Sequence, residues 1–170
     1  MDGSGLKQVG TRASQPFLTP DGSMVGFLAS PDPAGGCFSE VRLVSLEGDT
    51  RASVSGRFAQ GAAQANSPVS PDGRHILLTP CDLPRRPTLF TIEGQRERDY
   101  TVPASLNIGE AAVFNPLGWT ADGKPVFAYN NDQKRRFVGD INGNEIVPAG
   151  ADATILVQTQ FPWEQPLGRP

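Results

Sequence analysis

The sequence predicts an all-β protein built from repeated units of four short antiparallel strands. Three observations support this fold class. An Asp-Gly turn followed by an apolar run occurs three times, a second apolar segment ending in Gly follows each turn, and Gly and Pro number 19 and 16 among 170 residues. Frequent Gly and Pro without a period of three are typical of many short strands joined by tight turns.

The first repeated element is the Asp-Gly turn with its following strand. Its copies read FLTPDGSMVGFLAS, PVSPDGRHILLTP and GWTADGKPVFAYN, and their aspartates, Asp21, Asp72 and Asp122, are 51 and 50 residues apart. Asp can bond its own backbone in such a turn, and Gly can take the left-handed conformation. Alignment on the turns places apolar residues at alternate positions of each strand, as burial with period 2 requires. These residues are Val25 and Phe27, Ile76 and Leu78, and Val126 and Ala128.

The second repeated element reads EVRLVSLEG, PTLFTIEG and RRFVGDING. Apolar residues stand five and two positions before its final Gly in all three copies. They are Leu43 and Leu46, Leu89 and Ile92, and Val138 and Ile141. Asn142-Gly143 predicts a two-residue hairpin turn at the end of the third copy. A polar strand follows each turn, so the unit is predicted to contain four strands.

A fixed period near 50 residues points to β-propeller blades or another repeat array, because a single four-stranded sheet cannot bury both of its faces. Propellers have roughly four to eight blades. Three units therefore require closure by a homodimer, by missing blades of a longer chain or a partner, or by the terminal strands. We divide the chain into a disordered or non-native start (1–5), the repeats (6–163, with full units at about 11–56, 57–103 and 104–150 and partial units at both ends) and a Pro-rich tail (164–170).

The motifs TPDGSMVGF, SPDGRHILL and TADGKPVFA, each followed by a strand ending in Leu/Ile-x-Gly, resemble the WD40-like propeller repeats of TolB-type proteins. The resemblance covers about Leu6 to Trp163. It implies three four-stranded antiparallel propeller-type blades that form a partial or oligomerically closed β-propeller. Because TolB-like proteins are commonly exported, it also implies a periplasmic or extracellular location. The aromatic residue that the family often has before the turn is present only as Trp119, with Leu18 and Val69 in its place elsewhere.

The sequence predicts no catalytic residues, no cofactor and no metal site. His75 is the only histidine, it is expected to be an ordinary strand residue, and no Gly-x-Ser-x-Gly elbow accompanies it. The segment DINGNE resembles the start of a calcium loop. However, Glu145 and Ala151 stand where such a loop needs Gly and Glu.

Charge limits the classes of partner. The net charge is −3, and acidic and basic residues are interspersed, which does not favour binding to nucleic acid. No stretch approaches the roughly 18 apolar residues of a membrane span. Basic residues gather in the connections after the second strands of the later units. We interpret them first as part of a solvated surface of mixed sign. The functional alternative, which gives the candidate partner-binding residues, is that they bind an acidic protein surface or an anionic ligand: Arg85, Arg86, Lys134 and Arg135.

Cys37 and Cys81 occupy corresponding connections of adjacent units and can therefore lie on one face. They are either two partly buried thiols or a disulfide. A disulfide requires Cα atoms within about 7 Å and fits an oxidising compartment. Two partly buried thiols are the default expectation from the sequence, and the disulfide is the alternative.

These observations favour a non-catalytic binding or scaffold module of TolB-like type that mediates protein-protein interaction through loops on a rigid framework. One alternative is the gating or substrate-binding propeller of a larger enzyme, such as a prolyl-peptidase-like hydrolase. Another is an exported sensor domain of a bacterial signalling protein. The expected inner strands carry Phe17, Pro68, Val69 and Leu117. Such residues argue against a catalytic site on the propeller axis.

Overall fold

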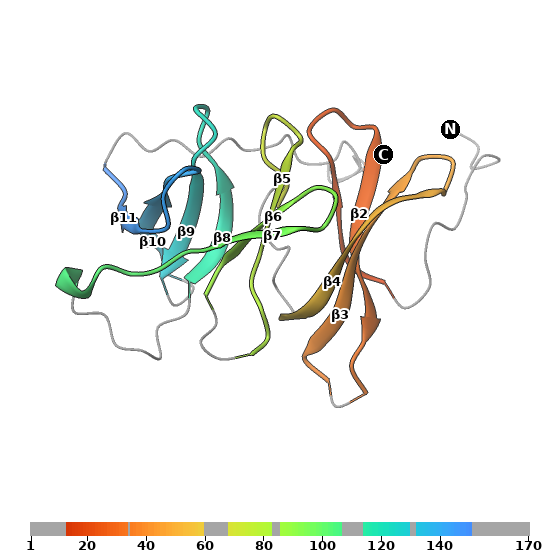
Figure 1. Cartoon of the computed structure of the whole chain (residues 1–170), viewed down its shortest axis with the longest axis horizontal. Helices are drawn as coiled ribbons and strands as arrows, with labels where there is room; N and C mark the ends of the chain where they lie inside the picture. Colours follow the sequence, from red (N-terminus) through yellow and green to blue (C-terminus); the bar gives the residue numbers. More distant parts are fainter. Residues whose placement is uncertain are drawn as a thin grey trace, which may run out of the picture.

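The computed structural model describes residues 13–33, 35–59, 68–82, 86–106, 114–129 and 132–150, without the side chains of 132–134. These ranges contain β-strands and one short 3₁₀ turn but no α-helix, which confirms the all-β prediction. The strands form three antiparallel sheets that follow one another along the long axis of the molecule (Figure 1). The predicted start, the partial units at both ends and the tail lie outside the described residues.

Each sheet is a meander in chain order, so that successive connections lie at opposite ends of its strands. Sheet A contains β1 (Ser14–Leu18), β2 (Met24–Pro31), β3 (Cys37–Ser45) and β4 (Thr50–Ala59). Sheet B contains β5 (His75–Leu78), β6 (Thr88–Thr91) and β7 (Arg96–Asp99), and the 3₁₀ turn η1 (Ala104–Leu106) follows it. Sheet C contains β8 (Phe114–Trp119), β9 (Pro125–Tyr129), β10 (Asp132–Gly139) and β11 (Ile146–Pro148).

Sheets A and C have the four strands that the sequence predicts, but sheet B has three. Its expected first strand is reduced to a single bridge between Val69 and Ile76. The carbonyl of Pro68 accepts the N–H of Leu77 at 2.8 Å. Pro68 has no N–H to donate in return, so the pair that it forms with Leu77 lacks its second hydrogen bond. Within the described residues, which do not include 60–67, the prediction of four strands therefore fails for the middle unit.

Sheet B is buried on both faces. Ile76, Leu78 and Phe90 pack with the side chains of sheet A in one core cluster. Leu77 and Leu89 point the other way and pack with the aromatic side chains of sheet C. A strand buried on both sides has no polar face, which explains the unbroken apolar run at the end of β5.

The three Asp-Gly turns share one hydrogen-bond pattern. The hydroxyls of Thr19, Ser70 and Thr120 each donate to the carboxylate of the Asp two residues later, at 2.6, 2.5 and 2.5 Å. The Gly three residues after each hydroxyl has φ of +70°, +72° and +80°, and its N–H donates to the carbonyl of the hydroxyl residue. The repeated aspartates thus occupy equivalent positions, and their role in the turns is structural.

The third turn closes one residue earlier than the first two. The hydroxyls of Thr19 and Ser70 accept the N–H of the fifth residue downstream, whereas Thr120 accepts that of the fourth, Lys124, at 2.9 Å. The fifth residue is Pro125, which has no N–H. The shorter closure advances the strand after the turn by one position.

This shift exchanges the two faces of β9. Phe127 packs in the cluster between sheets B and C. Alternation along the strand then directs Val126 and Ala128 to the opposite face, although both are buried. The prediction that Val126 and Ala128 correspond to Ile76 and Leu78 is therefore wrong, because alignment on Asp-Gly does not account for Pro125.

The hairpin between β10 and β11 also differs from the prediction. Gly139 pairs with Ile146, so that six residues, 140–145, form the connection. Neither Asn142 nor Gly143 has the positive φ that a two-residue hairpin turn of this type requires. Instead, the carboxylate of Asp140 accepts the N–H of Asn142 at 2.8 Å, which supports a longer loop.

Candidate functional site

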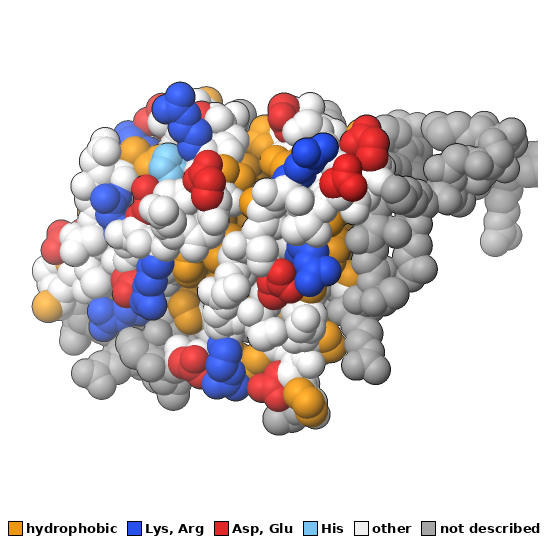
Figure 2. All heavy atoms as spheres, turned by 45° about the vertical axis from the view of Figure 1, so that its right-hand side comes forward, with side chains coloured by type: hydrophobic (Ala, Val, Ile, Leu, Met, Phe, Trp, Pro, Cys, Tyr) orange, Lys and Arg blue, Asp and Glu red, His pale blue; other side chains and the backbone are white. Residues whose placement is uncertain are grey.

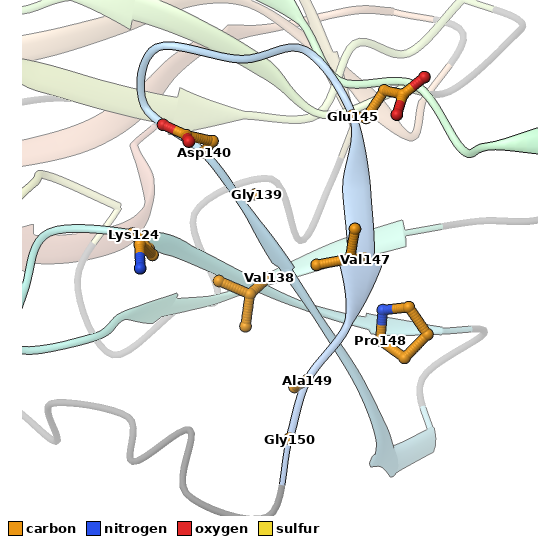
Figure 3. A pocket seen from close by; sticks show the side chains of 9 residues that line it. All are labelled: Lys124, Val138, Gly139, Asp140, Glu145, Val147, Pro148, Ala149 and Gly150. Carbon is orange, nitrogen blue, oxygen red and sulfur yellow. The ribbon is translucent and has the colours of Figure 1, made fainter.

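A groove lies beside β11 on sheet C (Figure 3). It has a volume of 390 Å³, and Val138, Val147, Pro148 and Ala149 supply apolar lining. Val147 is 52% exposed. The groove therefore offers accessible apolar surface on a strand held by the fold.

Charged side chains line the same groove. Lys124 extends from the third Asp-Gly turn, and its Nζ is 2.8 Å from Asp122 Oδ2. Asp140 and Glu145 come from the β10–β11 connection. Because the charge of Lys124 is compensated by Asp122, the two carboxylates make the rim of the groove acidic.

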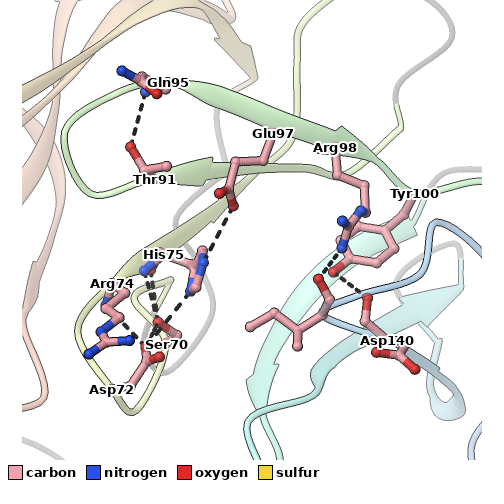
Figure 4. Close-up of polar contacts among 11 residues, drawn as sticks. Ser70, Asp72, Arg74, His75, Thr91, Gln95, Glu97, Arg98, Tyr100 and Asp140 are labelled. Atoms are coloured by element: carbon pink, nitrogen blue, oxygen red, sulfur yellow. Dashed lines mark hydrogen bonds and ion pairs between the residues drawn. The ribbon is translucent and has the colours of Figure 1, made fainter.

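The contact between sheets B and C holds the β10–β11 connection in place (Figure 4). The hydroxyl of Tyr100 donates to the carbonyl of Asp140 at 3.1 Å, and Arg98 donates to that of Ile141. Thr101 accepts the N–H of Ile146 at 3.0 Å. Burial raises the pKa of Tyr100 to about 12, so this phenol remains a neutral donor. One side of the groove is thus anchored to the neighbouring sheet.

His75 is the first residue of β5, a strand position as the sequence predicts. Its Nε2 is 3.4 Å from Glu97 Oε2 and its Nδ1 is 3.8 Å from Asp72 Oδ1 (Figure 4). Ser70 is adjacent, but its hydroxyl donates to Asp72 and accepts the backbone N–H of His75. In a nucleophilic triad the serine hydroxyl bonds the imidazole instead. Ser70, Asp72 and His75 therefore do not have the geometry of a triad.

Cys37 and Cys81 form a disulfide, with Cα atoms 5.9 Å apart. It joins sheet A to the chain that follows β5 of sheet B. Arg57 of β4 reinforces this contact, because it pairs with Asp32 at 3.2 Å and with Asp82 at 2.5 Å. The sequence raised the disulfide as one of two states, but no local pattern links Arg57 to two aspartates 25 residues away on either side.

The four predicted partner-binding residues are only partly covered by the described residues. Arg85 and the side chain of Lys134 lie outside them. Arg86 and Arg135 are exposed, and the guanidinium carbon of Arg135 lies 4.4 Å from the centroid of the Tyr129 ring. Figure 2 shows acidic and basic side chains interspersed over the face that it displays. A basic binding surface at these residues stays a prediction.

Within the described ranges, no group of three or more His, Cys, Asp or Glu side chains is placed to bind a metal ion. In the same ranges no helix has the length and apolar character needed to span a bilayer.

Comparisons with known proteins assign no family. No model of a protein family matches the chain, and no curated protein matches it. The class of the protein therefore rests on its own architecture, which is three stacked antiparallel meander sheets with equivalent turns.

Proposed function

We propose that the chain is a non-catalytic binding module built from propeller-type blades like those of TolB-type repeats, and that the groove beside β11 binds a segment of a protein partner. The observation that carries this proposal is the exposed Val147 in a groove that Val138, Pro148 and Ala149 also line. Binding sites are usually concave and mainly apolar, with a few polar or charged groups at fixed positions. Asp140 and Glu145 supply such charged groups here.

The blade architecture is supported by equivalence between the sheets. Each sheet is an antiparallel meander, and the Asp-Gly turns that precede β2, β5 and β9 share one hydrogen-bond pattern. The sheets also stack face to face in chain order, with sheet B covered by both neighbours. Stacked units of this kind provide a rigid support for recognition surfaces.

The groove favours recognition by side chains over addition of a strand. The N–H of Ile146 already donates to Thr101, and Pro148 has no N–H to offer a further strand. The apolar lining and the carboxylates of Asp140 and Glu145 instead suit a segment that presents an apolar residue next to Lys or Arg. We expect such a segment to place its apolar side chain against Val147.

Selection from a displayed peptide library on the intact chain tests this function. We expect enriched peptides to carry an apolar residue beside a basic one and to perturb the amide signals of residues 138–150. Val147→Asp should weaken their binding at least about tenfold, which corresponds to roughly 1.4 kcal/mol. Leu46→Asp is the matched control, because Leu46 is 58% exposed on the β3–β4 turn of sheet A.

Retained binding by the Val147 variant, or equal loss in both variants, would show that the groove is not the binding site. Failure to enrich any peptide would likewise argue against the proposed function.

A further inference from the structure

The two cysteines of the disulfide, Cys37 and Cys81, differ in burial. Cys37 begins β3 in sheet A and is buried. Cys81 lies three residues after the end of β5 and is partly exposed. A thiol arriving from solvent therefore reaches the sulfur of Cys81 more easily.

The guanidinium group of Arg57 lies beside the buried sulfur. Its Nη2 atom is 3.8 Å from Cys37 Sγ. An N–H donor in direct contact with a sulfur stabilises the thiolate that forms there, and the better stabilised thiolate leaves faster in disulfide exchange. The position of Arg57 thus makes Cys37 the sulfur that departs when the bond is attacked.

We propose that Cys37–Cys81 is a reversible redox site with a defined direction of exchange. In the first step an external thiolate attacks Cys81 Sγ and bonds to it, while the pair of electrons of the broken S–S bond passes to Cys37. In the second step another external thiolate attacks the sulfur now attached to Cys81. This step releases Cys81 as a thiolate together with an external disulfide. The protein gains the two electrons that the two external thiols lose.

The acidic partners of Arg57 limit which thiols react quickly. Asp32 and Asp82 both contact its guanidinium group, so the three groups together carry a net negative charge. This field repels an anionic thiol and attracts a cationic one. The expected order of rates is cysteamine, then 2-mercaptoethanol, then 2-mercaptoethanesulfonate. A neutral or cationic thiol, or a protein dithiol, is the class of reductant that the site accepts.

Reduction is expected to loosen this contact without separating the sheets. The N–H of Ala59 donates to the backbone carbonyl of Thr79 at 3.0 Å, and the N–H of Cys81 donates to the backbone carbonyl of Arg57 at 2.7 Å. These bonds lie next to the disulfide and lose its constraint on reduction. The core between sheets A and B is formed by other side chains and remains packed. Amide exchange should therefore accelerate at Ala59 and Cys81 and stay slow at Leu43.

Trapping of the mixed disulfide tests the direction of exchange in the intact chain. The protein is treated briefly with limiting 2-mercaptoethanol, quenched with acid, alkylated and mapped by mass spectrometry. We expect the mercaptoethanol adduct mainly on Cys81 and the alkyl group mainly on Cys37. Equal distribution, or a majority of adduct on Cys37, would overturn the proposal.

Substitution of Arg57 tests the role of the guanidinium group. Arg57→Gln should slow reduction about threefold or more, because the departing thiolate loses its contact with the guanidinium N–H. Arg51→Gln is the matched control: Arg51 also lies on β4, is similarly exposed (57% against 54%) and contacts Asp49 instead. An unchanged or faster rate in the Arg57 variant, or an equal decrease in the control, would contradict the assigned role.

Discussion

Thr120 Oγ1 accepts a hydrogen bond from the backbone N–H of Lys124 at 2.9 Å. The same hydroxyl donates to Asp122 at 2.5 Å, so that one buried group closes both sides of the turn. Thr19 and Ser70 form the corresponding pairs of bonds in the first two turns. Each turn therefore depends on a single hydroxyl.

We expect Thr120→Val to lower the free energy of unfolding by about 1–2 kcal/mol, since the substitution removes both partly buried hydrogen bonds of the hydroxyl. Urea denaturation measures the change. Thr91→Val should cost less, because the Thr91 hydroxyl forms a longer bond of 3.3 Å to the N–H of Gln95 in an exposed turn. A larger effect at Thr91 than at Thr120 would contradict this prediction.

Stability should fall in acid as the turn aspartates become protonated. The hydroxyl of Thr19 lowers the pKa of Asp21 from 3.8 to about 2, and the hydrogen bond from Lys124 lowers that of Asp122 to about 2. Because these pKa values are lower in the folded state, the ionised aspartates add to the free energy of unfolding above pH 3.8. This stabilisation is lost as the pH falls towards 2. Urea midpoints measured between pH 5 and pH 2 should show this decrease. Asp21→Asn should make the dependence shallower, and an unchanged slope would contradict the assignment.

Gly139→Ala should destabilise the contact between sheets B and C. A Cβ atom at this position would lie 2.6 Å from the Tyr100 ring, so the ring or the strand must move. We expect a loss of about 1–3 kcal/mol in calorimetry, with partial recovery in a double variant that also carries Tyr100→Leu. Gly150→Ala is the control, because nothing lies within 4 Å of its added Cβ. Equal effects at both glycines would show that the ring contact is not the cause.

The chain is expected to be a monomer in dilute solution. Phe27 and Ala29 on sheet A, and Val126 and Ala128 on sheet C, point away from sheet B but are buried in the single chain. Closure of a ring by a second copy is therefore not required to cover these side chains. Sedimentation over a concentration series measures the mass. A stable dimer at low micromolar concentration would instead favour a ring closed by two copies.

The sequence predicts much of the local structure, because neighbouring residues form the turns. Ser70, Asp72 and Gly73 make their defining contacts within a few positions, so their identities and spacing determine the bend. The spacing of Leu43, Leu89 and Val138 likewise identifies β3, β6 and β10, the strands that the second repeated element forms. Alignment on Asp-Gly failed only where Pro125 removed a donor, and this error changed which residues face sheet B.

The sequence by itself determined that the chain is all-β, where its Asp-Gly turns lie and that one segment, Ile76–Leu78, is apolar throughout. Only the tertiary structure decided that Arg57 joins Asp32 to Asp82 beside the disulfide and that Val147 lies exposed in a groove with Glu145. Turns form from hydrogen bonds between near neighbours in the chain, whereas these sites arise where sheets or separate strands meet. Their geometry depends on how whole sheets pack, which no local pattern specifies.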